Sequence, residues 1–434
     1  MAVQRGPAAQ MLHCERDSLG PVSAQQLEKW AAEARKRWSV PALTVGVLQD
    51  GAVVSAADGV LELGRPEPVS PDTVFRIASI TKPFTATLAM TLVQDGLLAL
   101  DEPPPGAPVE ATVRQLLSHQ GGLASEWPEP LDGVGNDDDA LLRLTEGQPA
   151  RLPIGPGELF SYCNAGFWFA AAAIARVLGT TFEEAMRTRV LEPLGLRSTG
   201  FEAEAPARGH KQVEKGATEH APAEKGYPRV RRPGGGLLSS VGDLLRFAEH
   251  HLGGPGPLTA ESIAEMQRPL SAGPGFRYGL GWFLWETRAG SSVGHPGSVL
   301  GYESLLRLVP GERLAVAALS NSSRGYAAIR DVMRDLDLGE EELSEVALEN
   351  LTAFAGRYQG QEVELEFVPE DGGLRVERTE VDPFTGETSI YPSVRARPVG
   401  EREFEIVDGE WRGDRFDFPR PGFVCMGSLA TRIE

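Results

Sequence analysis

One segment limits the folds open to this chain more than any other, because it reads as a helix without a polar face. Residues 165–178 (AGFWFAAAAIARVL) are apolar almost throughout, and residues 79–98 form a second run of small and apolar residues. A helix that is hydrophobic all round is buried on every side. The chain has 434 residues, which is enough to surround such helices and predicts two domains.

The net charge excludes two classes of partner. It is -19, whereas nucleic acids and anionic membranes bind basic surfaces. No run reaches the ~18 apolar residues of a membrane-spanning helix, and residues 1–20 lack the apolar core of a secretory signal. The cysteines Cys14, Cys163 and Cys425 are far apart, which fits a reducing compartment. We expect a cytoplasmic protein that contacts neither nucleic acid nor membrane, unless its natural start lies upstream.

Apolar periodicity and turn residues predict the order of the elements. Residues 23–38 have helical spacing behind a capping Ser23, and Asp50-Gly51 lies between two β-branched runs, which indicates a hairpin. Further helices are expected at 111–118, 240–252 and 324–337, and antiparallel strands at 280–286, 292–298, 302–309 and 313–320.

Composition divides the chain into three parts. Residues 1–22 are expected to be a flexible lead-in, residues 23–345 a large domain, and residues 351–434 a small all-β domain with alternating segments and Asp-Gly turns. The acidic stretch 339–350 separates the two domains. Within the large domain, residues 203–233 are polar and charged, and we expect a flexible excursion at the rim of a cleft.

The first candidate catalytic pair is Ser79 and Lys82. Residues three apart on a helix share a face, so the lysine ammonium is expected beside the serine hydroxyl. Burial and the positive end of the helix dipole both disfavour a charged lysine, which then acts as a base near neutral pH. A serine nucleophile without a histidine partner needs such a base. The alternative is that Ser79 only caps the helix.

The second candidate element is Tyr162-Cys163-Asn164, just before the apolar helix. Tyr162 and Asn164 are two apart and point into a cleft if the segment is a loop. We expect Tyr162 to relay a proton to a leaving group and Asn164 to hold Lys82 and the substrate carbonyl side. The alternative roles are a packing tyrosine and a capping asparagine.

The third candidate element is Gly294-His295-Pro296-Gly297-Ser298. Glycine in a strand allows a ligand to approach the backbone closely, so Gly297 is assigned to the substrate side and the Ser298 N–H to an oxyanion hole. His295 is expected to hydrogen-bond to Tyr162 or Lys82. If a neutral His295 is required, kcat/KM should fall as the pH drops through about 6.5. The alternative is a surface histidine in a tight turn.

A competing motif, Gly290-Ser291-Ser292-Val293-Gly294, matches the G-x-S-x-G nucleophile elbow. That motif needs a preceding strand and a following helix. Here a second strand is expected to follow, so a hairpin loop is the better interpretation and Ser292 is not the nucleophile. The sequence has no recognisable metal-binding spacing, because His250 and His251 are adjacent and no H-E-x-x-H occurs.

With these three elements in this order, the chain resembles the serine β-lactamase-like hydrolases. The resemblance is to the branch of class C β-lactamases, DD-peptidases, D-aminopeptidases and family VIII esterases, whose pattern is S-x-x-K, Y-x-N and then K-T-G or H-x-G. The likeness spans roughly residues 24–338. Its other stretches are 75–79, 116–119, 122–123, 235–240, 243–244 and 278–282.

The resemblance implies an α+β fold of the β-lactamase/penicillin-binding-protein type. Its antiparallel sheet is flanked by the terminal helices, an all-α subdomain is inserted, and the site lies at their junction. In that fold Ser79 is the nucleophile, Lys82 and Tyr162 share general-base work, and the Ser79 and Ser298 N–H groups form the oxyanion hole. No cofactor is implied. Residues 351–434 resemble small β-barrel-like extensions that border the site and limit substrate size.

The departures from the family pattern affect the expected substrate. His295 stands where the lysine of K-T-G helps bind a substrate carboxylate, and histidine is mostly neutral at pH 7. We therefore expect hydrolysis of esters or amides of small acids, or of D-amino-acid peptides, before β-lactamase or DD-peptidase activity. The alternative of another class is a non-catalytic acyl-binding sensor. The sequence is compatible with a homo-oligomer.

Overall fold

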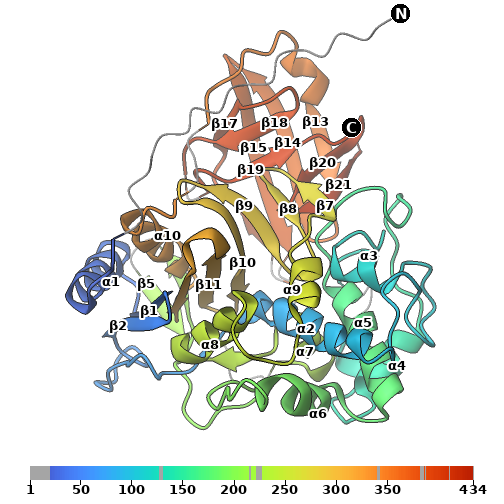
Figure 1. Cartoon of the computed structure of the whole chain (residues 1–434). Helices are drawn as coiled ribbons and strands as arrows, with labels where there is room; N and C mark the ends of the chain where they lie inside the picture. The colour runs from blue at the N-terminus through green and yellow to red at the C-terminus, as the bar shows by residue number, and fades with distance from the viewer. Residues whose placement is uncertain are drawn as a thin grey trace, which may run out of the picture.

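The computed structural model of the chain describes residues 20–126, 131–214, 217–220, 227–339, 343–381, 386, 388–409 and 411–433. The expected lead-in at residues 1–22 lies almost entirely outside these residues. Within them the chain forms a layered α+β domain and a separate all-β domain that stands above it in Figure 1.

An antiparallel sheet of eight strands is the centre of the larger domain. Its strand order is β2-β1-β12-β11-β10-β9-β8-β7. The strands are β1 Ala42–Gln49, β2 Ala52–Gly59, β7 Ser271–Gly273, β8 Phe276–Tyr278, β9 Phe283–Thr287, β10 Gly290–Val299, β11 Tyr302–Val309 and β12 Leu314–Ser320. The first hairpin therefore pairs with the last strand, in the register Val45↔Ala318, as the resemblance implies.

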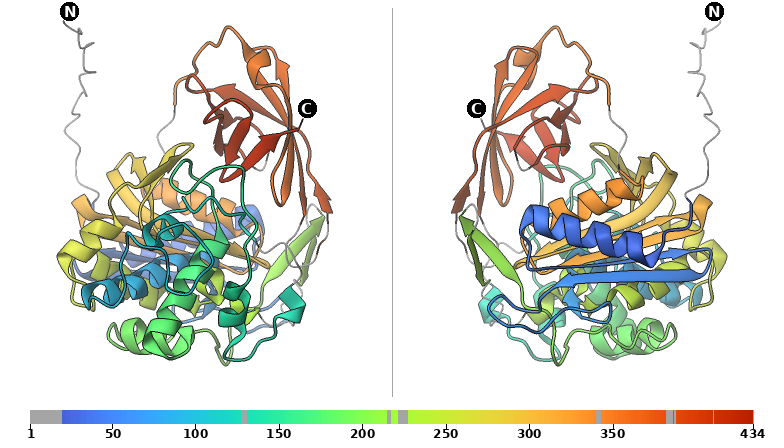
Figure 2. Two further views of the ribbon diagram at one scale, coloured as in Figure 1. Left: turned by 90° about the vertical axis from the view of Figure 1, so that its right-hand side faces the viewer. Right: turned by 90° about the vertical axis from the view of Figure 1, so that its left-hand side faces the viewer.

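Helices cover both faces of this sheet, which explains why every residue of β12, and every residue of β1 except the last, is buried. One face packs on α1 (Ala24–Trp38) and α10 (Gly325–Asp335), the two helices in the foreground of the right-hand view of Figure 2. The other face packs on α8 (Val241–His251). β1 alternates between the layers: Val45 and Val47 face the first, and Gly46 lies against Leu245 of the second.

A mainly helical region is inserted between β2 and β7. Besides α8, its helices are α2 Thr81–Gln94, α3 Val113–Leu117, α4 Ala140–Glu146, α5 Asn164–Leu178, α6 Phe182–Met186, α7 Arg232–Gly235 and α9 Ala260–Met266. Short strands accompany them: β3 Phe75–Arg76 pairs with β6 Leu238–Ser239, and β4 His210–Glu214 pairs with β5 Ala217–His220. The α5 residues from Ala165 to Ala175 are all buried, as a helix without a polar face requires.

The C-terminal domain is a closed β-barrel. Eight strands follow the order β14-β13-β21-β20-β19-β18-β17-β15, β14 also pairs with β15 to close the ring, and β16 is appended to β15. The strands are β13 Gly356–Gln359, β14 Val363–Glu370, β15 Gly373–Val381, β16 Thr388–Ile390, β17 Val394–Pro398, β18 Glu403–Ile406, β19 Arg415–Asp417, β20 Phe423–Met426 and β21 Ser428–Arg432. Closure leaves no unpaired edge in the ring.

Side chains from both domains form a common apolar cluster. Ile154, Phe160 and Tyr278 of the larger domain pack there with Cys425 and Leu429 of the barrel. The β20–β21 hairpin is thereby held against the segment that leads into α5.

Three details differ from the sequence-based predictions or qualify them. The helix expected at 79–98 begins later, because residues Ala78–Ile80 form a 3-10 turn and α2 starts at Thr81 and ends at Gln94. The polar excursion at 203–233 contains the β4–β5 hairpin. Among the described residues no single helix could span a membrane by length and composition, although the bent pair Asn164–Leu178 and Phe182–Leu191 passes that test together.

Candidate active site

The turn before α2 presents Ser79 to the junction between the sheet and the helical region. Ala78, which precedes the serine, has a φ of 46°, a left-handed conformation that is uncommon for a residue with a Cβ. Ser79 lies in the 3-10 turn, and Lys82 lies in the first turn of α2. The Lys82 Nζ is 3.2 Å from the Ser79 Oγ, so the structure brings the predicted pair together.

Lys82 is fully buried and has three polar partners. Besides Ser79, its Nζ donates to Asn164 Oδ1 at 2.7 Å and to the Gly234 carbonyl at 2.8 Å. Burial lowers the pKa of Lys82 to about 7, although the nearby Glu126 carboxylate opposes the shift. At neutral pH a large fraction of this lysine is therefore an uncharged amine beside the serine hydroxyl.

Tyr162 completes the group around Ser79. Its hydroxyl lies within hydrogen-bonding reach of Ser79, and Lys82 Nζ is 4.6 Å from the centre of its ring. Desolvation raises the pKa of the Tyr162 phenol, so the group stays protonated at neutral pH. His119, which was quoted above only as part of a family-like stretch, packs against this ring with centroids 4.2 Å apart and the ring planes tilted by 32°. The N-cap of α5 is Cys163, so Asn164 is free of the capping role considered above.

Strand β10 passes directly beside the turn that carries Ser79. A Cβ at Gly297 would lie 2.3 Å from the Ile77 carbonyl oxygen and 3.1 Å from the Ser79 nitrogen. Only glycine allows this approach, which is why a glycine is needed in the strand. The next residue, Ser298, lines the same pocket as Ser79. Its hydroxyl donates to Glu303 Oε1 at 2.7 Å.

His295 does not make the contacts expected from the sequence. It is buried on β10, where its Nδ1 donates to the Pro296 carbonyl at 2.6 Å and its Nε2 accepts from the Tyr278 hydroxyl at 3.1 Å. The predicted hydrogen bond to Tyr162 or Lys82 is therefore wrong. Burial lowers the pKa of His295 to about 3, so it cannot titrate near pH 6.5 as expected above. The alternative of a surface histidine is equally wrong.

The competing serine and the cysteine have structural roles. Ser292 is buried near the start of β10, paired with Trp285 inside the sheet and not in the predicted hairpin loop, and its hydroxyl donates to the Trp285 carbonyl at 3.3 Å. No helix follows it, so the elbow geometry is missing. Burial raises the pKa of the Cys163 thiol to about 12, which keeps it protonated. The described part of the chain contains no group of three or more His, Cys, Asp or Glu side chains placed to hold a metal.

A pocket of about 250 Å³ opens at Ser79. Ser79, Tyr162, Asn164 and Ser298 line it, together with residues that the sequence analysis did not assign to the site. These additional residues are Ala78, Ser125, Glu126, Trp168, Tyr227, Arg231, Gly234, Gly235, Val299, Glu362 and Ser428. Glu126 and Arg231 are close to family-like stretches, which is a weak signal. Glu362 and Ser428 come from the barrel, and no local pattern indicates them.

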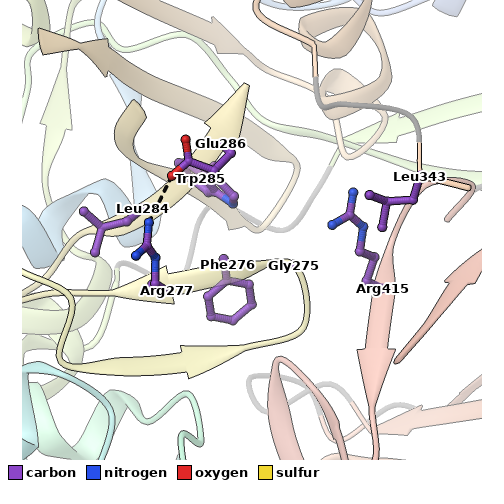
Figure 3. Close-up of a pocket in the computed structure, with 8 residues that line it drawn as sticks. All are labelled: Gly275, Phe276, Arg277, Leu284, Trp285, Glu286, Leu343 and Arg415. Carbon is purple, nitrogen blue, oxygen red and sulfur yellow. Dashed lines mark hydrogen bonds and ion pairs between the residues drawn. The ribbon is translucent and has the colours of Figure 1, made fainter. Parts of the chain in front are cut away.

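A second pocket, of about 310 Å³, lies between the β8–β9 hairpin and the barrel (Figure 3). Its lining includes Arg277, which pairs with Glu286 at 3.0 Å, and Arg415 of β19 on the opposite side. None of the residues that line it is a serine, cysteine or lysine. Ser79, the candidate nucleophile, lines the smaller pocket instead.

Comparison with known proteins agrees with this geometry. Residues 27–338 match the Beta-lactamase family. Penicillin-binding protein 4 of Amycolatopsis lactamdurans is 32% identical over 70% of this chain and 87% of its own length. A D-aminopeptidase of Gluconobacter oxydans is 26% identical over 81% of this chain and 69% of its own.

A solved structure extends the likeness to the C-terminal barrel. The crystal structure of SurE superposes with a TM-score of 0.74 at 26% identity, covering 94% of this chain and 99% of that one. SurE has also been solved with D-Leu, and that structure gives a TM-score of 0.73 at 25% identity. The fold is thus of the β-lactamase/penicillin-binding-protein type with a C-terminal barrel. Together with the match over residues 27–338, this places the chain in the beta-lactamase family, as a serine hydrolase.

Proposed function

We propose that this hydrolase works through an acyl-enzyme on Ser79. The neutral Lys82 amine removes the Ser79 proton while Oγ attacks the substrate carbonyl, and the N–H groups of Ser79 and Ser298 stabilise the oxyanion. When the tetrahedral intermediate collapses, the leaving group receives a proton through Tyr162. Water then attacks the acyl-enzyme. The same groups remove a proton from the water and return one to the Ser79 oxygen, which releases the acid and restores the enzyme. The 3.2 Å contact between Lys82 Nζ and Ser79 Oγ is the observation that carries this assignment.

We further propose that the substrates are amides, esters or short peptides of small D-amino acids. The pocket is small, and the barrel residues Glu362 and Ser428 close one side of it. Arg231 pairs with Glu126 in the lining, and Glu362 adds a second carboxylate. The charged side chains that line the pocket therefore carry a net negative charge, which suits an acyl group with a free amino group. The likeness to a D-aminopeptidase and to SurE supports the same substrate class.

A substrate panel tests this assignment. D-alanine p-nitroanilide is expected to be hydrolysed faster than its L enantiomer and than N-acetyl-D-alanine p-nitroanilide, because acetylation removes the positive charge. A short ester such as p-nitrophenyl acetate reports the acyl-transfer chemistry without that recognition. Equal rates for the free and the acetylated D-substrate would contradict the proposal.

Two alternatives are outcomes of the same panel. Rapid turnover of nitrocefin, with little hydrolysis of the anilides, would indicate the β-lactamase or DD-peptidase function, which the 32% identity to penicillin-binding protein 4 favours. A single stoichiometric burst followed by a long-lived acyl-enzyme would indicate an acyl-binding sensor instead.

The pH dependence separates Lys82 from His295. A base acts in its neutral form, so kcat/KM should rise as the pH increases through about 7, the pKa of Lys82. His295, with a pKa of about 3, is already neutral throughout that range. His295→Gln should therefore leave the midpoint in place, whatever its effect on the rate. A midpoint that disappears in this variant would assign the titration to His295.

A further inference from the structure

Glu126 is linked to the nucleophile through two side chains. The Asn164 Nδ2 donates to Glu126 Oε1 at 2.6 Å, and the Asn164 Oδ1 accepts from Lys82 Nζ at 2.7 Å. An amide has one donating and one accepting end, whereas an ionised carboxylate only accepts. Glu126 therefore fixes the Asn164 amide with its oxygen towards Lys82, which in turn aims the lysine at Ser79.

Glu126 is itself held from two sides. Its Oε2 is 3.1 Å from Arg231 Nη2, and both side chains are less than one-tenth exposed. Its backbone N–H donates to Gln361 Oε1 at 2.8 Å, and Gln361 Nε2 donates to its carbonyl at 2.8 Å. Gln361 belongs to the barrel, in the turn between β13 and β14. One barrel side chain thus satisfies both backbone groups of Glu126.

The barrel also holds the segment that carries the catalytic tyrosine. The Tyr162 N–H donates to the Gly427 carbonyl at 3.1 Å, and the Ser428 hydroxyl donates to the Tyr162 carbonyl at 3.2 Å. The Leu429 N–H donates to Ser161 Oγ at 3.2 Å. The β20–β21 hairpin is therefore hydrogen-bonded to the segment that supplies Tyr162 and Asn164. The Gln361 turn is hydrogen-bonded to the segment that supplies Glu126.

We propose that Glu126 is a positioning residue for the Ser79–Lys82 pair, and that Gln361 of the barrel holds the Glu126 backbone in place. The barrel is on this account part of the catalytic apparatus as well as a wall of the substrate pocket. This role concerns the acyl-transfer chemistry and holds whichever acyl group the enzyme accepts.

The charge of Glu126 is tested with Glu126→Gln. Glutamine keeps an oxygen that accepts from Asn164 but removes the negative charge that favours the Lys82 ammonium. The acidic limb of kcat/KM for p-nitrophenyl acetate should move to lower pH than in the wild type. A ¹³C titration of lysine-labelled protein gives a readout without turnover, because the chain has only six lysines and Lys82→Ala identifies the signal.

The positioning role is tested with Glu126→Leu and Gln361→Ala. Leucine removes the acceptor for Asn164, and kcat should fall about 10- to 100-fold with a smaller change in KM, since small misplacements of reacting groups cost that much. Gln361→Ala removes two hydrogen bonds and should lower kcat about 5- to 10-fold. Arg420→Ala is the matched control, because it breaks another contact between the domains, the 2.9 Å pair with Glu158, away from Glu126.

Two results would contradict the positioning role of Glu126 and Gln361. A Lys82 midpoint that is unchanged in Glu126→Gln, in the kinetics and in the NMR titration, would overturn the link to Lys82. If Gln361→Ala and Arg420→Ala lower kcat equally, Gln361 only helps to hold the two domains together and does not position Glu126. Neither the hydrolysis of p-nitrophenyl acetate nor the NMR signal depends on recognition of a D-amino acid. If the proposed substrate class is wrong, the D-alanine anilides will not be preferred, but the effects of the Glu126 and Gln361 variants on these two readouts will remain.

Discussion

Ser79→Ala is expected to lower the hydrolysis of p-nitrophenyl acetate by ~10³-fold or more, because removal of a nucleophile disables the catalytic group as a unit. Covalent labelling of the protein by a fluorophosphonate, detected by intact mass, should be lost at the same time. The Ser79 hydroxyl lies at a turn, where it accepts from Lys82 Nζ and is within hydrogen-bonding reach of Tyr162, so the fold should survive its loss.

Ser292→Ala is the matched control for that prediction. Ser292 belongs to the competing G-x-S-x-G motif, but its hydroxyl donates to the Trp285 carbonyl within the sheet. Its replacement should leave labelling and the rate within about twofold of the wild type, with at most the modest stability loss of one hydrogen bond. Labelling that persists in Ser79→Ala and disappears in Ser292→Ala would refute the assignment of the nucleophile.

Lys82→Ala is expected to lower kcat/KM by ~10³- to 10⁴-fold, the upper range for loss of a general base within a coupled group. The remaining activity should lack the rise near pH 7, since the pKa of His295 is about 3 and no titration of that residue falls in this range. Propylamine supplies the atoms that the substitution removes. It should restore part of the rate, because Lys82 is fully buried and its loss leaves a cavity lined by Asn164 and Gly234.

Lys29→Ala controls for the loss of a lysine. Lys29 is exposed on α1, on the far side of the sheet from Ser79, and its replacement should change neither the rate nor the pH profile. Thermal unfolding of both variants separates lost chemistry from lost stability. A midpoint near pH 7 that persists in Lys82→Ala would assign the base to another group.

The sequence by itself determined the features that depend on local spacing. The apolar runs at 165–178 and 79–98 correspond to α5 and α2, which are buried as a helix without a polar face must be. The three-residue spacing of Ser79 and Lys82 places them in contact even though Ser79 lies in a 3-10 turn, because residues three apart also lie on one side of that turn. Strand periodicity likewise predicted β9 to β12.

The tertiary structure alone decided which distant groups meet at the site. His295 accepts a hydrogen bond from Tyr278. This contact depends on how β8, β9 and β10 lie in the sheet and not on any spacing along the chain. Glu126 joins the network through Asn164 and Gln361, and Gln361 is 235 residues further along the chain. The pKa values follow from the same packing: Lys82 is lowered to about 7 and His295 to about 3 because folding removes water from both. Desolvation is a property of everything packed around a group, and a linear pattern contains no record of it.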